Sequence, residues 1–379
     1  MTDIPFDITA RPGLELAVEA FKANFSDGLE HGAQFCAYQN GELLLDLKGG
    51  WADRRKTQPV TDDTLFAVFS SGKAVAALVI ATLADDDRLG YEQPVRSIWK
   101  EFTSHGKGKL TVAQIMSHQA GLSGITDPNW TVEDWYDWEK VCATLAAQEP
   151  LFAPGSASGY HPVTYGFLAG EIARLTDSGG RSLGQILHQD ICAPLGLDIW
   201  IGLPETEHAR CADMIKPRAL ADLGEINPAT QAAFLSPTSS PAPAGLTQWR
   251  EAELAGSNCH ATAKALAQIM QMAIDGTVCG QKFLAEDVTG FLSQPRISGP
   301  NLVLPFDITF AAGLMHNASN YFYGPNPETL GHSGWGGSCV FADPVTGITG
   351  AYAMSRQDNT LLGDTRPRRI IDALYEAIV

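Results

Sequence analysis

Apolar runs near both ends of the chain flank turn signals, and the apolar residues between them recur at helical spacing. Near the N-terminus two such runs flank Asn40-Gly41, and near the C-terminus two others flank the turn at 343–347. Both patterns predict β-hairpins, because a short Gly-containing turn between two such runs joins antiparallel strands. The four predicted strands are 33–39, 42–48, 337–342 and 348–354.

Helical spacing of apolar residues dominates the rest of the chain. An amphipathic helix is predicted at 14–25 and a final helix at 368–378. The predicted helices of the middle are 74–88, 111–118, 132–147, 164–176, 182–191 and 261–274. The proline-containing segment 235–246 is predicted to be a long irregular loop.

Strands at both ends around a helical middle predict a mixed α/β (α+β) fold. We expect a central antiparallel sheet built from both chain ends, flanked by helices, with a mostly helical domain inserted. The predicted α/β domain combines residues 1–69 and 260–379, and the predicted helical domain spans 70–259, with a site at their interface. A length of 379 residues fits such a two-part fold.

Composition narrows the range of partners and compartments. The net charge of −17 argues against nucleic acid or an anionic membrane as the main partner. No apolar run approaches the roughly 20 residues that span a bilayer, and the first residues lack the pattern of a secretory signal. The seven cysteines form no C-x-x-C pair, which favours reduced, mostly buried thiols and a cytoplasmic location.

Ser70-Ser71-Gly72-Lys73 is the segment with the most specific chemistry. It follows a β-prone run and opens the apolar helix at 74–88. Residues three apart share a helix face, so Ser70 and Lys73 are expected together at a helix N-terminus, where negative charge is favoured. A lysine beside an apolar helix is poorly solvated, so its neutral form gains weight and can help to remove a serine proton. Two other Ser-x-x-Lys matches, at 97–100 and 104–107, lead no such helix.

Further blocks place polar residues or glycines where a site can form. The segment 110–122 is a capped helix that ends in a glycine turn, and 194–197 is a helix-stop turn; both are interpreted as structural. Tyr160 lies on a loop ahead of a helix, although a lone tyrosine is usually a half-buried packing residue. The glycines of 331–338 let the backbone approach another chain segment or a ligand closely.

In this order and spacing, the blocks resemble those of the serine β-lactamase and penicillin-binding-protein-like superfamily, over about residues 30–355. The class C branch and the family VIII carboxylesterases are the most similar. The Tyr-His-x-x-Thr-x-Gly pattern at 160–166 is more like the esterases than the β-lactamases.

The resemblance implies a role for each residue that matches the motifs. Ser70 is the implied nucleophile, Lys73 its helper and Tyr160 the partner that shuttles the proton. With the Lys73 ammonium beside it, Tyr160 is expected to exist partly as phenolate. The backbone N–H groups of Ser70 and Trp335 are the implied oxyanion hole. The residues implied to bind substrate are His161, His332, Ser333, Gly334 and Trp335.

Two departures from the β-lactamase pattern bear on the substrate. The triplet that β-lactamases write Lys-Thr-Gly is His332-Ser333-Gly334 here, and their Tyr-x-Asn motif ends in Pro162. The missing lysine is a cation suited to a β-lactam carboxylate, and Pro162 has no donor to replace the Asn carboxamide. Both changes favour neutral ester substrates.

Signals for other chemistries are absent from the sequence. It contains no G-x-S-x-G motif of α/β-hydrolases, no H-E-x-x-H motif or clustered metal ligands, and no nucleotide-binding glycine motif. No metal and no cofactor is therefore predicted. Trp130, Trp135, Tyr136 and Trp138 lie near helical spacing, and they either line an acyl pocket or belong to the core.

The sequence thus predicts a serine carboxylesterase that cleaves short-acyl or compact small-molecule esters through an acyl-enzyme on Ser70. A β-lactam or amide hydrolase, or an acyltransferase, of the same fold is the first alternative. A non-catalytic binding protein that has kept the fold is the second. The joint presence of Ser70, Lys73 and Tyr160 argues against that second alternative.

Overall fold

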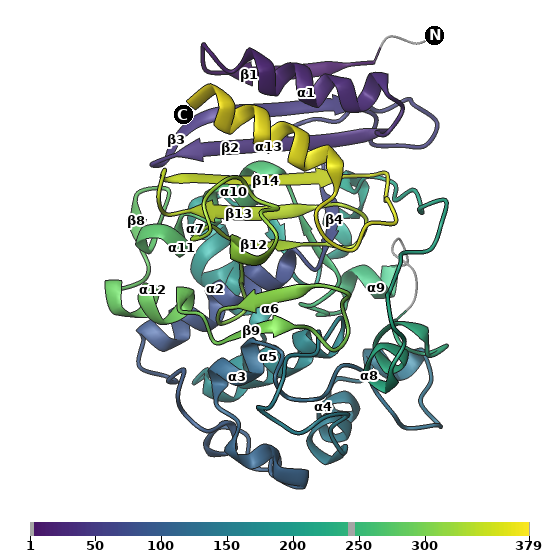
Figure 1. Cartoon of the computed structure of the whole chain (residues 1–379), viewed down its shortest axis with the longest axis vertical. Coiled ribbons are helices and arrows are strands. Elements are labelled where there is room, and N and C mark those ends of the chain that lie inside the picture. The colour runs from purple at the N-terminus through teal and green to yellow at the C-terminus, as the bar shows by residue number, and fades with distance from the viewer. Residues whose placement is uncertain (1–3, 242–246, 379) are drawn as a thin grey trace.

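The computed structural model describes residues 4–241 and 247–378, and its central layer is a nine-stranded antiparallel sheet (Figure 1). The strands of this sheet are β1 (Phe6–Ala10), β2 (Gly32–Gln39), β3 (Glu42–Gly50), β9 (Ile297–Pro300), β10 (Asp307–Phe310), β11 (Met315–His316), β12 (Leu330–Ser333), β13 (Cys339–Asp343) and β14 (Ile348–Met354). Their order is β1-β3-β2-β14-β13-β12-β11-β10-β9. The two chain ends meet where β2 pairs with β14, which confirms a sheet built from both ends.

Both predicted hairpins are present. Strands β2 and β3 pair so that Gln39 faces Glu42 across Asn40 and Gly41, whose φ angles of +51° and +81° suit a tight hairpin turn. Strands β13 and β14 pair across the predicted turn at 343–347. Strands β1 and β9 to β12 were not predicted, because they have only two to five residues and no strong turn signal between them.

The helices lie on both faces of this sheet and below it. Their bounds are α1 (Glu15–Ser26), α2 (Gly72–Asp85), α3 (Val112–Met116), α4 (Trp138–Ala147), α5 (Thr164–Thr176), α6 (Leu183–Ile186), α7 (Ala193–Leu195), α8 (Pro228–Thr230), α9 (Thr247–Glu251), α10 (Ala263–Ile269), α11 (Met272–Asp275), α12 (Glu286–Ser293) and α13 (Thr365–Ile378). Short strands β4 (Phe66–Phe69), β5 (Ile199–Trp200) and β6 (Cys259–Ala261) form a second sheet, and β7 (Thr277–Val278) and β8 (Gln281–Lys282) a third.

Three predicted helices are interrupted in the structure. The segment 132–147 is a 3-10 turn followed by α4, because the Asp137 side chain accepts the Lys140 N–H and starts a new helix there. The segment 182–191 begins as α6 and continues as a π-helix at Leu187–Cys192. The segment 261–274 is divided into α10 and α11. Of the predicted loop 235–246, residues 242–246 lie outside the described residues.

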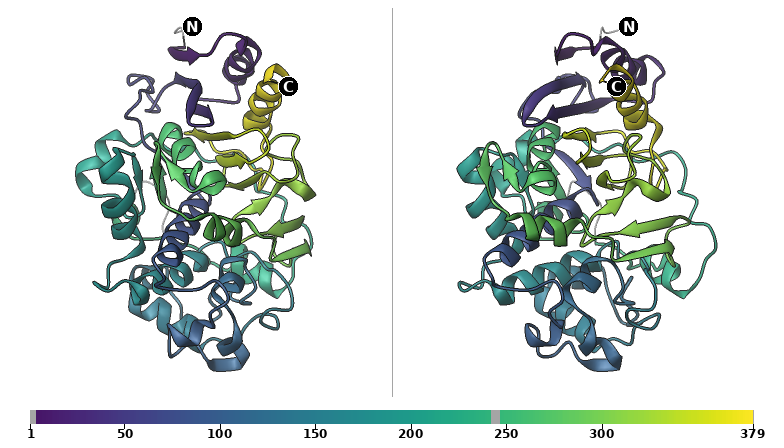
Figure 2. Two further views of the ribbon diagram at one scale, coloured as in Figure 1. Left: turned by 90° about the vertical axis from the view of Figure 1, so that its left-hand side faces the viewer. Right: turned by 60° about the vertical axis from the view of Figure 1, so that its left-hand side comes forward.

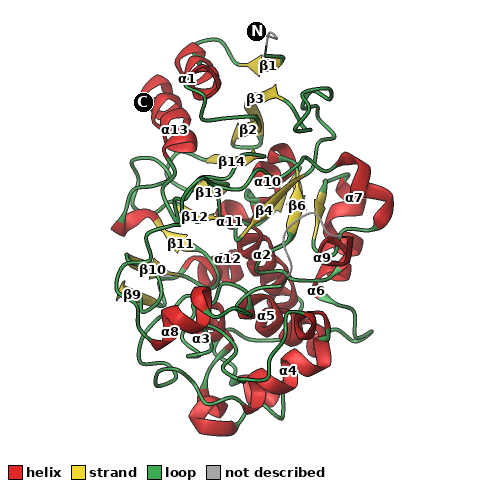
Figure 3. Ribbon diagram, turned by 90° about the vertical axis from the view of Figure 1, so that its right-hand side faces the viewer, coloured by secondary structure: helices red, strands yellow, loops and turns green. Residues whose placement is uncertain are grey.

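Two apolar layers enclose the large sheet. Helices α1 and α13 pack against each other on its outer face, as the purple and yellow helices in Figure 2 show. Helix α10 packs against β2 and β14 on the inner face. The inner core continues without a break into the helical region, around α2 and α5 (Figure 3). The division of the chain into an α/β domain and a helical domain therefore stays a prediction from the sequence, because one core is continuous across both.

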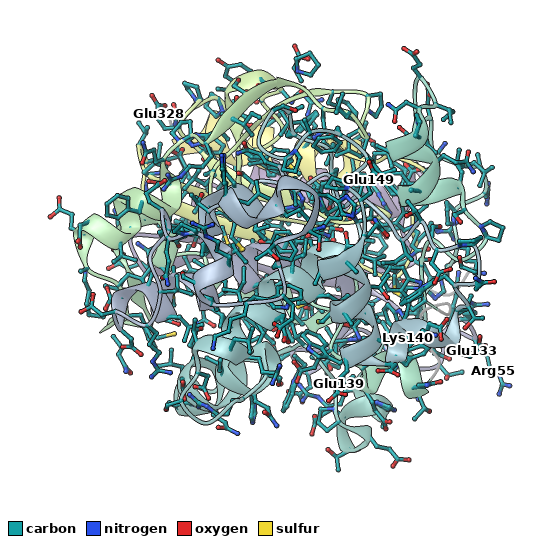
Figure 4. The ribbon with its side chains drawn as sticks, turned by 90° about the horizontal axis from the view of Figure 1, so that it is seen from below. Arg55, Glu133, Glu139, Lys140, Glu149 and Glu328 are labelled. Atoms are coloured by element: carbon teal, nitrogen blue, oxygen red, sulfur yellow. The ribbon has the colours of Figure 1, made fainter. Side chains whose placement is uncertain are left out.

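Several acidic side chains are exposed on the outer surface of the helical region. Glu133, Glu139 and Glu149 are exposed there, and Figure 4 shows them on the lower face of the molecule with Lys140. This distribution agrees with the net charge of −17. Among the described residues, no helix combines the length and the apolar character needed to cross a bilayer.

Candidate active site

Ser70 lies at the sharp turn between β4 and α2. Phe69, just before it, has a φ of +47°, which is uncommon for a residue with a side chain and turns the chain abruptly. Helix α2 begins at Gly72 and is buried along most of its length. Because the buried apolar helix α2 follows directly, its packing holds the turn in place. The half-buried Ser70 hydroxyl lies at the N-terminus of this helix.

Lys73 is fully buried one helical turn after Ser70. Its Nζ lies 2.9 Å from Ser70 Oγ, 2.7 Å from the carbonyl oxygen of Pro162 and 2.6 Å from that of Gly256. Burial lowers the pKa of Lys73 well below its ordinary value, as the sequence predicted. A neutral amine has two N–H donors and one lone pair. The two carbonyl oxygens can only accept, and the Ser70 hydroxyl donates to the Gly256 carbonyl over 3.2 Å. The lone pair of a neutral Lys73 can therefore take the Ser70 proton once that hydroxyl turns away from the carbonyl.

Tyr160 completes a compact group with these two residues. It is 5% exposed, and its ring centre lies 4.9 Å from Lys73 Nζ. Burial raises the pKa of the Tyr160 phenol above its ordinary range, and a hydrogen bond with the Ser70 side chain opposes that shift only in part. The phenol is therefore neutral at neutral pH, and not the partial phenolate expected from the sequence.

Trp335 lies at the tip of a turn beside Ser70. The turn is closed by the Gly337 N–H, which donates to the Gly334 carbonyl over 3.1 Å, and Gly336 adopts a φ of +86°. A Cβ on Gly334 would lie 2.2 Å from the Val68 carbonyl oxygen, so only glycine permits this close approach to the Ser70 turn. Among the described residues, the Trp335 N–H has no hydrogen-bond acceptor.

Ser70, Tyr160 and Trp335 line one cavity of about 330 Å³. None of the described residues that line it carries a charged side chain. Its larger apolar lining residues are Phe69, Val163, Phe234, Trp249, Leu304, Leu361 and Leu362. Such a cavity suits a compact, uncharged molecule whose reactive carbonyl reaches Ser70.

Comparison with known proteins identifies the family. The Beta-lactamase family profile matches residues 21–375. The chain belongs to the beta-lactamase family. Esterase/beta-lactamase LipL of Mycobacterium tuberculosis (strain ATCC 25618 / H37Rv) is 32% identical over 361 residues, which cover 92% of this chain and 82% of LipL.

Two solved structures are similar to this chain over nearly its whole length. A penicillin-binding protein homologue from Caulobacter crescentus is 50% identical, with a TM-score of 0.94 over 98% of this chain and 100% of its own. A family VIII carboxylesterase is 36% identical, with a TM-score of 0.90 over 98% of this chain and 100% of its own. The resemblance predicted from the sequence is confirmed, and the chain is a hydrolase of the beta-lactamase fold.

Two histidines that the family resemblance assigned to substrate binding lie behind the cavity wall. His161 and His332 are fully buried and are not among the lining residues. Burial lowers the pKa of each to about 3, so both rings are neutral. The His332 ring lies 6.1 Å from that of Tyr160, and the His161 Nε2 accepts the Leu122 N–H. Both histidine rings therefore contact other parts of the protein and do not reach the cavity.

The other expected substrate-binding residues lie at the end of β12. Ser333 lines the cavity and exchanges a hydrogen bond of 2.8 Å with the Tyr323 hydroxyl. Gly334 provides the close contact with the Ser70 turn described above. The tryptophans near helical spacing do not line this cavity. Trp135 and Trp138 pack against Phe167 of α5, as core residues do.

Sequence reasoning missed three residues of this beta-lactamase-family site. Gly256 contributes only its carbonyl, which accepts from both Lys73 and Ser70 and leaves no side-chain signal. Asn301 accepts the Tyr160 N–H through Oδ1 and donates to Ser158 Oγ. The His118 ring lies 4.8 Å from the Tyr160 ring at a tilt of 50°. The φ of +62° at His118 marks a strained position that the helix-cap interpretation did not reveal.

Proposed function

We propose that this chain is a serine carboxylesterase that cleaves short-acyl or otherwise compact, uncharged esters through an acyl-enzyme on Ser70. One observation carries the proposal. The Ser70 hydroxyl contacts the buried Lys73 amine at 2.9 Å, at the wall of a cavity whose described lining has no charged side chain. A nucleophile needs an adjacent base, and a neutral substrate needs no counter-ion.

The proposed acylation starts from the neutral amine. Lys73 accepts the Ser70 proton while Ser70 Oγ bonds to the ester carbonyl carbon. The carbonyl oxygen becomes an oxyanion, which the backbone N–H groups of Ser70 and Trp335 stabilise. When the intermediate collapses, the bond to the alcohol oxygen breaks, and Tyr160 passes the proton to that leaving oxygen. Tyr160 in turn recovers a proton from the Lys73 ammonium.

Deacylation follows the same path with water in place of the alcohol. Lys73 and Tyr160 together take a proton from water, whose oxygen attacks the acyl carbon of the ester on Ser70. The second tetrahedral oxyanion uses the same two donors. Collapse returns the proton to Ser70 Oγ and releases the carboxylic acid.

Two residues, one in the cavity wall and one behind it, support esters over β-lactams. A β-lactam antibiotic carries a carboxylate, and the position of the usual cation is held by the buried, neutral His332. The position of the usual carboxamide is held by Pro162, which has no donor. Each lost hydrogen bond to a charged group is worth on the order of 1.5–3 kcal/mol. The similarity to a family VIII carboxylesterase supports the same substrate class.

β-Lactam hydrolysis is the second candidate, because LipL carries both the esterase and the β-lactamase name. We expect kcat/KM for p-nitrophenyl butyrate to exceed that for nitrocefin by at least about a thousandfold. The β-lactam lacks both a cation for its carboxylate and a carboxamide partner for its side chain, whereas the ester needs neither. Comparable values would contradict the ester proposal and favour a β-lactamase. Adding a competing alcohol to the ester assay distinguishes hydrolysis from acyl transfer.

A covalent probe separates catalysis from binding alone. A fluorophosphonate should attach to the peptide that holds Ser70, as read by mass spectrometry, and Ser70→Ala should abolish the adduct. Failure of the wild-type chain to react would support the non-catalytic alternative.

The cytoplasmic location remains part of this proposal. It rests on the seven cysteines, which are all unpaired and of which five are buried.

A further inference from the structure

Arg366 is a buried arginine at the start of α13, and only 2% of it is exposed. Its guanidinium has five N–H donors, and every one has an acceptor. Nε and Nη2 donate to the Asp364 carboxylate at 3.0 and 2.8 Å, and Nη1 donates to Glu30 at 2.8 Å. The two remaining donors reach backbone carbonyls, of Gly336 at 2.6 Å and Arg356 at 2.7 Å.

The Gly336 carbonyl belongs to the turn that presents Trp335. It also accepts the Asp358 N–H at 3.0 Å, so the peptide after Gly336 is held from two sides. Gly336 and Gly337 have φ angles of +86° and +119°, which only glycine adopts readily, and so the turn has little steric preference of its own. The orientation of this turn therefore depends on what its carbonyls contact.

The arginine packs directly on that turn. A Cβ on Gly337 would lie 2.3 Å from Asp364 Oδ2 and 2.4 Å from Arg366 Nη2. No side chain separates the buried ion pair from the turn backbone. Arg366 itself does not line the substrate cavity. Any effect of Arg366 on the reaction is therefore indirect, and the turn is its contact nearest to Ser70 and Trp335.

Stability alone is a weak reason for this arrangement. Glu30, Asp364 and Arg366 are all buried, and the desolvation of buried ions offsets much of their mutual attraction. Apolar residues of similar volume often stabilise a core as well as a buried ion pair does. What apolar residues cannot do is hold two backbone carbonyls at fixed positions.

We infer that Arg366 is a positioning residue for the oxyanion hole: by holding the Gly336 carbonyl, it keeps the Trp335 N–H directed at the substrate carbonyl oxygen. This inference rests on the proposed function, since it assumes that an oxyanion forms beside Ser70. A planar guanidinium is required, because a lysine ammonium has three donors and cannot reach all these acceptors at once.

The test uses Arg366→Lys, with Arg369→Lys as the matched control. Arg369 lies on the same helix, is partly exposed and pairs with Asp27. Loss of one oxyanion donor costs about 10²–10³ in kcat. We expect Arg366→Lys to lower kcat for a p-nitrophenyl ester at least about tenfold, with KM changed less than threefold. Arg369→Lys should change neither.

A boronic acid supplies the readout that a purely structural role would not move. Its boron bonds to the serine oxygen and forms a tetrahedral anion like the intermediate, so its affinity reports the oxyanion hole. In Arg366→Lys we expect the inhibition constant of the boronic acid to rise by the same factor by which kcat/KM falls. Circular dichroism and urea unfolding test whether the Arg366→Lys variant folds. If it does not fold, Glu30→Gln, which leaves the Gly336 contact intact but loosens the guanidinium, should give a smaller parallel loss.

The outcomes separate this inference from the proposed function. Unchanged kcat and boronate affinity in a folded variant, with an active wild type, would overturn the positioning role and leave the esterase proposal intact. A wild-type chain that neither cleaves esters nor binds the boronate would overturn both.

Discussion

Replacing Lys73 by methionine tests whether the buried amine is neutral in the folded protein. Methionine fills a similar volume without a titratable group. It also leaves the Pro162 carbonyl without its Lys73 donor, at a cost of about 1–3 kcal/mol, and leaves the Gly256 carbonyl with the Ser70 hydroxyl alone. The absolute stability of the variant at one pH therefore mixes several effects. The change of stability with pH isolates the ionisation of Lys73.

The direction of that change follows from proton linkage. The pKa of Lys73 is lowered in the fold by burial, whereas an unfolded lysine titrates near about 10.4. Between those two values the unfolded chain binds one proton more than the folded chain, so the free energy of unfolding rises with pH. The slope is up to about 1.4 kcal/mol per pH unit for one proton. Lys73→Met lacks this term.

Urea unfolding of both proteins between about pH 7 and pH 10 measures the difference. We expect the wild type to gain stability relative to Lys73→Met as pH rises over this range, which lies below the ordinary lysine pKa. Lys22→Met is the control, because Lys22 is on the surface, with 40% of its side chain exposed, and the curve of this variant should run parallel to that of the wild type. Parallel curves for Lys73→Met would refute the reasoning, since Lys73 would then keep its proton in the fold and could not act as base.

Three further outcomes are expected, two in ester hydrolysis and one in cephalosporin hydrolysis. Ser70→Ala should abolish it and Ser104→Ala should not; a Ser70→Ala variant with more than about a tenth of wild-type activity would exclude Ser70 as nucleophile. Tyr160→Phe should lose at least about a hundredfold in kcat, and adding Lys73→Met should cost little more, because the two act as one unit; fully additive losses would make Tyr160 a packing residue. Leu361→Lys, at the cavity wall, should raise kcat/KM for an anionic cephalosporin about tenfold over Leu361→Met, and equal values would argue against the missing cation as the cause of ester preference.

The parts of this fold that could be predicted from the sequence are those determined by local residue patterns. The hairpin at Asn40-Gly41 is defined by its turn residues, and the helix after Ser70 by a long apolar run. The pairing of β2 with β14 followed only from the placement of strands at both chain ends. Strands β9 to β12 were missed, because each is stabilised by its neighbours in the sheet and not by its own sequence pattern.

The candidate site shows the same division. Ser70 and Lys73 are one helical turn apart, so their contact was predictable from spacing. The pKa direction of Tyr160 was not, because it depends on burial by segments distant in the sequence. The Gly256 carbonyl has no side-chain signature. Arg366 gave no signal either, since a single arginine in a C-terminal helix is ordinarily a surface residue.

The charge state of the site residues bears on the rate of the proposed reaction. Burial favours the neutral forms of Lys73, Tyr160 and His332 alike, so the resting site holds little charge. In the proposed mechanism, attack by Ser70 then creates two charges at once, an oxyanion and a lysine ammonium. Charges interact more strongly in a site with little water than in solvent, so fixed N–H donors aimed at the oxyanion lower the barrier without any rearrangement. For the same reason the placement of the Trp335 turn matters more here than in a site where a permanent cation already offsets the developing negative charge.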